Sequence, residues 1–211
     1  MEILGYRRAD GSLGIRNHVL VIPTVSCVNR VAMDIVYQTE AVTFLHPYGC
    51  TFDEEENTIT EDTFIGYGKN PNVGAVLVVS LGCETASAAR ISREISETNK
   101  DVEILVVQEE GGSRTTTQRG VQKVKQLQQK LDQQKLVEGH LSELIIALEC
   151  GSSDAFSGLS ANPAVGEASD IIVEQGGTVV LSEVTEMNGA ENVLARRAKD
   201  DKLREQLLAV I

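Results

Sequence analysis

The chain has 211 residues, enough to bury a sizeable core, and its 42% hydrophobic content is typical of a globular protein. It carries 19 Lys and Arg against 31 Asp and Glu, so its net charge of -12 argues against nucleic acid or an anionic membrane as a partner. No apolar run reaches the roughly 18 residues of a membrane helix, and the N-terminus lacks the apolar core of a signal peptide. We therefore expect a cytoplasmic protein whose four cysteines are thiols or metal ligands rather than disulfides.

Short apolar runs rich in β-branched residues predict six buried strands, at residues 19–22, 42–45, 75–79, 102–107, 144–148 and 178–181. Helical segments are predicted between and after them, at residues 29–38, 60–67, 85–98, 115–136, 162–175 and 190–210. The acidic stretch 51–62 is interpreted as a hydrophilic connection. This alternation predicts one α/β domain over residues 1–211, with an open, doubly wound, mostly parallel Rossmann-like sheet of about six strands and helices on both faces.

All four cysteines follow predicted strands. Cys27, Cys50, Cys83 and Cys150 come after the first, second, third and fifth strands, and the fourth and sixth end in the polar stretches QEEGGS and SEVTEMNG. The carboxyl ends of parallel strands lie along one edge of a sheet, and ligands bind outside that edge. We therefore expect these residues to converge on one site.

Two shorter patterns refine this expectation. The spacing in HPYGC allows His46 and Cys50 to reach one metal ion. The glycine-rich turns EEGGS and CGSSD match neither a phosphate-binding loop with its lysine nor a dinucleotide fingerprint, which argues against nucleotide binding.

Longer motifs carry a family resemblance. GYRRADGSLGIRNHVLVIPTVSCVN, HPYGC, NPNVGAVLVVSLGCE, QEEGGSRTT, ECGSSDAFSGLSANPAVGEASD and GGTVVLSEVTEMNGAE resemble the altronate/galactarate dehydratase family, often called the UxaA family, which also contains sulfolactate sulfo-lyase. The resemblance implies a lyase that removes water from a sugar acid to give a 2-keto-3-deoxy acid, with Fe²⁺ or another divalent metal. A [4Fe–4S] cluster is the less favoured alternative, because the cysteines come from separate loops.

The resemblance also suggests roles for individual residues. It implies a metal neighbourhood formed by His46, Cys50, Cys83 and Cys150. The substrate would be held by Arg16, Asn17, Arg114, Ser152 and Ser153, because guanidinium groups pair with carboxylates. Candidates for general acid and base are Glu84, Glu149, Asp154, Glu183 and Glu186.

The organisation of the family raises further alternatives. Members carry a small N-terminal domain or work with a separate small subunit, whereas the first family motif here begins at Gly5. We therefore expect a fragment, the N-terminal part of the large catalytic region without the family's C-terminal half. A sulfolactate sulfo-lyase subunit, a non-catalytic binding module that needs a missing half, and a homo-oligomer all stay open.

Overall fold

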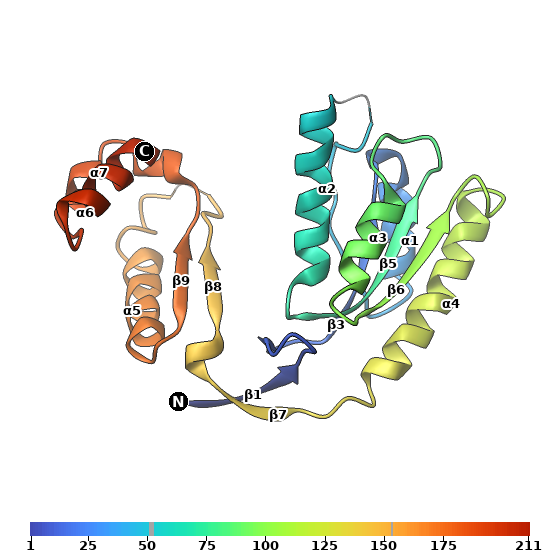
Figure 1. The fold of residues 1–211 in the computed structure, drawn as a ribbon, viewed down its shortest axis with the longest axis horizontal. Helices are drawn as coiled ribbons and strands as arrows, with labels where there is room; N and C mark the ends of the chain where they lie inside the picture. The colour runs from blue at the N-terminus through green and yellow to red at the C-terminus, as the bar shows by residue number, and fades with distance from the viewer. Residues whose placement is uncertain (51–52, 153) are drawn as a thin grey trace. The chain divides into compact units, whose positions relative to one another are not determined.

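A computed structural model describes residues 1–50, 53–152 and 154–211 (Figure 1). The chain forms two compact units: a larger one, Ile3–Gly139, and a smaller one made of Met1–Glu2 and His140–Ile211. This division differs from the single α/β domain that the sequence pattern predicted. No helix among the described residues is both long enough and apolar enough to cross a membrane.

The larger unit is built on a parallel sheet of four strands. The strand order is β4 (Val42–Thr43), β3 (His18–Pro23), β5 (Val73–Ser80) and β6 (Asp101–Val106). The chain reaches β4 on one side of β3 and then continues to β5 on the other, so the direction of winding reverses between β3 and β5. In open α/β sheets such a reversal is where ligand crevices form, outside the carboxyl ends of the strands.

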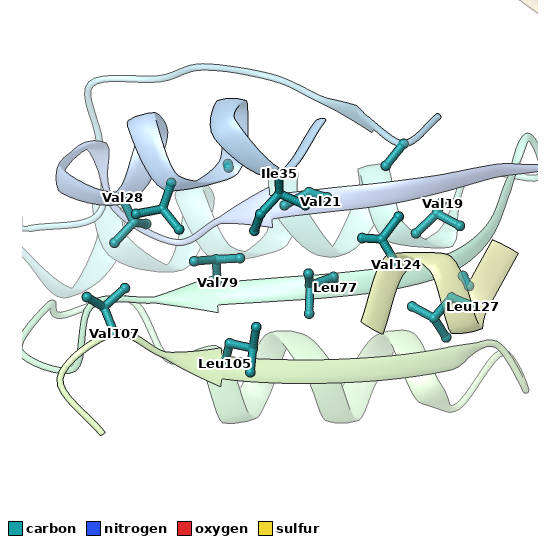
Figure 2. Close-up of a cluster of buried hydrophobic side chains, with 14 of the residues drawn as sticks. Val19, Val21, Val28, Ile35, Leu77, Val79, Leu105, Val107, Val124 and Leu127 are labelled. Carbon is teal, nitrogen blue, oxygen red and sulfur yellow. The ribbon is translucent and has the colours of Figure 1, made fainter. Parts of the chain in front are cut away.

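Helices cover both faces of this sheet. Figure 2 shows one face, where Val19, Val21, Leu77 and Val79 pack in one cluster with residues of α1 (Asn29–Val36) and α4 (Ser113–Leu131). The alternate strand residues, among them Leu20 and Ile22, pack with α2 (Glu54–Lys69) and α3 (Ala88–Ser96). Because both faces are covered, β5 is buried along its whole length, as its continuous apolar sequence predicts.

Three further strands form a second sheet. β1 (Glu2–Arg7) lies between β2 (Leu13–Gly14) and β7 (Val137–His140), and it pairs with β2 antiparallel. The sequence pattern did not predict these strands.

Helix α2 starts earlier in the chain than the sequence pattern predicted. The helix begins at Glu54, where the Asp53 side chain accepts a hydrogen bond from the backbone N–H of Glu56. The acidic stretch is therefore mostly the first turns of a helix, because carboxylates are favourable at a helix N-terminus.

The smaller unit holds the last two predicted strands in a sheet of their own. β8 (Ile145–Leu148) pairs in parallel with β9 (Thr178–Leu181), and α5 (Ala161–Glu174) connects them. Short helices complete the unit: η2 (Leu141–Glu143), η3 (Val184–Met187), α6 (Glu191–Ala195) and α7 (Asp201–Val210), whereas η1 (Ser26–Val28) lies in the larger unit. The prediction of one sheet of about six strands is therefore wrong, because the structure has a four-stranded and a two-stranded parallel sheet instead.

Candidate active site

In the larger unit, Glu84 occupies the point where the sheet reverses its winding. Its Oε1 accepts hydrogen bonds from Thr24 Oγ1 at 2.5 Å and from the backbone N–H of Leu81 at 3.0 Å. Its Oε2 accepts one from the Gly82 N–H at 2.7 Å. Burial raises the pKa of Glu84, but hydrogen bonds from Ser80, Thr24 and the backbone outweigh it, so the pKa lies below its ordinary value. This carboxylate connects the loops after β3 and β5, and its lowered pKa favours the ionised form.

His46 lies in the loop after β4 and is held by backbone groups on both ring nitrogens. Its Nε2–H donates to the Pro23 carbonyl at 2.8 Å, and its Nδ1 accepts from the Tyr48 N–H at 3.1 Å. The residue is 8% exposed, and its ring lies against Phe64, with centroids 4.6 Å apart. Burial lowers the pKa of His46, so the ring is neutral in the fold.

The same loop approaches the backbone of the loop after β3. Gly49 has a φ of +102°, and a Cβ at this position would lie 2.1 Å from the Thr24 carbonyl oxygen, so only glycine fits. The Gly49 carbonyl accepts hydrogen bonds from the N–H of Thr85 at 3.1 Å and from its hydroxyl at 3.2 Å. Next to it, Cys50 is half-buried and packs against the core, whereas Cys27 and Cys83 are exposed.

The residues expected to bind a metal ion are divided between the two units. Across residues 1–50, 53–152 and 154–211, no three His, Cys, Asp or Glu side chains are placed to hold one metal ion. His46 would also have to give up a backbone hydrogen bond to bind a metal. Cys50 and Cys83 lie in the larger unit and Cys150 in the smaller one.

The predicted substrate-binding residues of the larger unit lie at two different places. Arg16 and Asn17 immediately precede β3, so they lie at the edge opposite Thr24 and Glu84. The Asn17 side chain is engaged there, accepting a hydrogen bond from Arg8 at 2.9 Å and donating one to the Leu131 carbonyl at 3.3 Å. Arg114 lies in the first turn of α4, which follows β6, and is exposed.

The smaller unit brings most of the other candidates together. A cavity of about 1170 Å³ lies beyond the carboxyl ends of β8 and β9, and its lining includes the predicted residues Glu149, Cys150, Ser152, Asp154, Glu183 and Glu186. Ser153 falls outside the described residues. Glu149 and Cys150 follow β8 directly, and Glu183 lies two residues after the end of β9. The placement follows from the parallel pairing of the two strands, which puts their carboxyl ends side by side.

Contacts within this cavity link Cys150 to two carboxylates, Glu183 through the backbone and Glu186 through the thiol. The Cys150 backbone N–H donates to Glu183 Oε2 at 2.7 Å. The charge of Glu186, then burial, then the charge of Glu183 raise the pKa of the Cys150 thiol, which also shares a hydrogen bond with Glu186. The group is therefore a protonated thiol at neutral pH rather than a thiolate nucleophile.

Glu183 also has an unusual backbone. Its φ of 61° and ψ of 52° place it in the left-handed region, which is unfavourable for a residue other than glycine. Strained positions of this kind cluster at functional sites, where the surrounding structure holds a side chain in place.

The sequence analysis missed two charged residues of this lining, Asp170 and Arg197. Asp170 lies in the middle of α5, and Arg197 follows α6 in a stretch predicted as helix. Neither residue directly follows a strand, so the strand-end pattern does not indicate them. Asp170 ends the family motif ECGSSDAFSGLSANPAVGEASD, and Arg197 lies outside all of the quoted motifs.

Known protein families match almost the whole chain. Residues 5–132 match the family described as D-galactarate dehydratase/altronate hydrolase, second domain, and residues 141–211 match D-galactarate/altronate dehydratase, C-terminal. The gap between the two matches contains the Gly139/His140 boundary of the two units. The second match places residues 141–211 in the C-terminal domain, which differs from the expectation that the chain lacks the family's C-terminal half.

Individual proteins are also similar. The chain is 35% identical to altronate dehydratase of Escherichia coli over 100% of its own length and 44% of that protein. It is 36% identical to (2R)-sulfolactate sulfo-lyase subunit beta of Chromohalobacter salexigens, covering 98% of the chain and 53% of that protein. Galactarate dehydratase (L-threo-forming) of Escherichia coli is 34% identical, over 97% of the chain and 43% of that protein. The chain therefore spans about half the length of these relatives, or less.

Proposed function

The chain belongs to the D-galactarate dehydratase/altronate hydrolase family, and from this premise we propose that it forms part of a hydro-lyase that dehydrates a sugar acid. Two of the similar proteins are named altronate dehydratase and galactarate dehydratase. The observation that carries the proposal is the cavity of the smaller unit, because it places a thiol and several carboxylates in one lining.

The proposed chemistry is the elimination of water next to a carboxylate. A base removes the proton from the carbon beside the carboxylate, and the electron pair forms a double bond as the neighbouring hydroxyl leaves. A proton donor turns the leaving hydroxyl into water, and the resulting enol becomes a 2-keto-3-deoxy acid. The reaction therefore needs one proton acceptor and one donor within reach of adjacent carbon atoms.

Cys150 and Glu186 are our candidates for this pair. They share a hydrogen bond, and the charge of Glu186 keeps the thiol protonated. Glu186 would accept the proton from carbon, and the Cys150 thiol would protonate the leaving hydroxyl. Glu183 would position Cys150 through its hydrogen bond to the backbone N–H. None of these steps is assigned to Fe²⁺, whose binding is tested separately.

The test is turnover of altronate and galactarate by the full-length protein, measured by the formation of 2-keto-3-deoxy acid. We expect Cys150→Ser and Glu186→Gln to lose at least 100-fold in kcat, since acid–base groups typically contribute 10²- to 10⁴-fold. Cys27→Ser and Glu167→Gln are matched controls, because both residues are exposed and neither lines the cavity. Normal kcat in Cys150→Ser and Glu186→Gln would refute the assignment.

Sulfolactate cleavage is the second candidate, and the similarity to a sulfo-lyase subunit favours it. It begins with the same proton abstraction, but sulfite leaves in place of hydroxide. Release of sulfite from sulfolactate, without dehydration of altronate or galactarate, would select it. That relative is named as a subunit beta, which also supports a search for a second polypeptide that co-purifies with the protein.

Iron is tested separately from turnover. We expect that, if the full-length protein holds iron after anaerobic loading, His46→Asn will retain it, because both ring nitrogens already bind backbone groups. The measurement is metal content per chain. Loss of iron in His46→Asn with an unchanged thermal midpoint would show that His46 is a ligand.

A further inference from the structure

Most of the charged side chains that line the cavity of the smaller unit are acidic. Its lining includes the carboxylates of Glu149, Asp154, Asp170, Glu183 and Glu186, and Arg197 is the single cationic side chain among the described residues that line it. A sugar acid carries a carboxylate of its own, which these groups repel. An anionic substrate therefore needs a local positive charge in order to enter this cavity.

We propose that Arg197 is the residue that anchors the substrate carboxylate in this cavity. The inference rests on the proposed function, and it adds a specificity-determining residue that neither the strand-end pattern nor the family resemblance indicated. A guanidinium group suits this task, because its planar fork can donate two parallel hydrogen bonds to a carboxylate.

The surroundings of Arg197 leave its guanidinium available for a ligand. Within the described part of the chain, its side chain makes no hydrogen bond or ion pair with another residue, although five carboxylates share the same cavity. The residue follows α6 and is exposed. It can therefore exchange water for a carboxylate without first breaking a contact within the protein.

The adjacent arginine provides a matched comparison. Arg196 is also exposed, but its Nε donates to the Asn192 carbonyl at 3.0 Å, and the residue lines a different hollow with Asp200, Asp201 and Arg204. The two arginines thus share sequence context, charge and exposure and differ in the cavity that they face. Any effect confined to Arg197 cannot be attributed to net charge.

The position of the anchor also bears on the reaction. Arg197 lines the same cavity as Cys150 and Glu186, whereas Arg16 and Arg114 lie in the larger unit. A carboxylate held by Arg197 would bring its neighbouring carbon into the cavity that contains the proposed acid–base pair. Holding one end of the substrate in this way lowers the entropic cost of the chemical step.

The experiment compares Arg197→Gln, Arg197→Lys and Arg196→Gln in the full-length protein. For altronate we expect Arg197→Gln to raise KM about 10- to 100-fold with a smaller change in kcat, since charged hydrogen bonds of this kind contribute about that much to binding. Arg197→Lys should recover part of the loss, because it keeps the charge without the fork. Arg196→Gln should match the wild type.

A second readout separates anchoring from a structural effect. The wild type should prefer altronate to its neutral amide, and Arg197→Gln should lose this preference while Arg196→Gln keeps it. Thermal unfolding checks that the variants are folded. If the wild type turns over altronate and Arg197→Gln behaves as Arg196→Gln does, the anchor is refuted and the proposed function stands.

If the wild type turns over no sugar acid, the proposed function fails and the anchor is tested by binding alone. Calorimetry with altronate should then show binding to the wild type and to Arg196→Gln, and binding at least 10-fold weaker to Arg197→Gln. Equal affinity for all three proteins, or no binding to any of them, would overturn the inference.

Discussion

At the scale of single residues, the hydrogen bonds of a carboxylate decide whether it can carry a proton. The family resemblance made both Glu84 and Glu186 candidates for acid–base roles. In the structure Glu84 accepts hydrogen bonds from several groups, among them Thr24, Leu81 and Gly82. Glu186 instead lines a cavity beside a thiol. Sequence position alone could not separate them, because Thr24 reaches Glu84 from the loop after β3 and Cys150 reaches Glu186 from the loop after β8.

Glu84 should therefore contribute to stability. Its pKa is lowered in the fold, so the ionised form is favoured there, and its contribution is present above the ordinary pKa of 4.5 and is lost as the pH falls through the lower folded value. We expect Glu84→Gln to lose about 1 to 3 kcal/mol at pH 7, because the amide cannot accept all of these hydrogen bonds. Urea unfolding at pH 7 and pH 3 measures this. Glu97→Gln at an exposed site is the control, and an equal loss in both variants would contradict the expectation.

Substitutions at Glu183 should reveal how much its left-handed backbone conformation lowers the free energy of unfolding. Replacement by alanine removes the carboxylate and keeps the strain, whereas replacement by glycine removes both. We expect Glu183→Gly to be about 1 kcal/mol more stable than Glu183→Ala, measured by urea unfolding, and both to lose turnover. Equal stability of the two variants would mean that the backbone relaxes at this position.

At the scale of elements, the strongest sequence signals were confirmed. The apolar runs at residues 75–79 and 178–181 lie within β5 and β9. The strands β1 and β7 were missed because buried and exposed positions are mixed along them, and β2 was missed because it has only two residues, so none of the three carries a continuous apolar run. The division of the predicted strands into two sheets depends on pairing between distant segments, which strand and helix alternation does not specify.

The first residue of α2 could have been predicted from the sequence. Asp53 followed by three glutamates is a typical N-terminal pattern, with a capping side chain and an acidic first turn. We expect Asp53→Ala to destabilise the larger unit by about 1 kcal/mol, whereas Asp53→Asn should retain most of the cap. Urea unfolding of the three proteins is the measurement. A loss in Asp53→Asn as large as in Asp53→Ala would show that charge, and not the cap, is what matters.

At the scale of the whole molecule, the two units differ in how much apolar surface they bury. Both clusters of buried apolar residues in the larger unit consist of residues within 3–139, including Val21 and Leu77 on one face of the sheet and Ile22 and Ile95 on the other. In the smaller unit α5 and α7 have no buried residue, and Ile145, Phe156 and Leu159 are 74%, 72% and 78% exposed. The candidate site thus lies in the unit with the smaller core.

This contrast predicts how the two parts behave when they are produced separately. Residues 3–139 should fold alone and unfold cooperatively in urea, because the apolar burial that opposes conformational entropy lies within them. Residues 140–211 should lack a cooperative transition, since a two-stranded sheet with exposed apolar side chains buries too little to be stable. Circular dichroism during urea titration of both fragments gives the comparison. Cooperative unfolding of the 140–211 fragment alone would contradict it, and the acid–base cavity could then be studied in isolation.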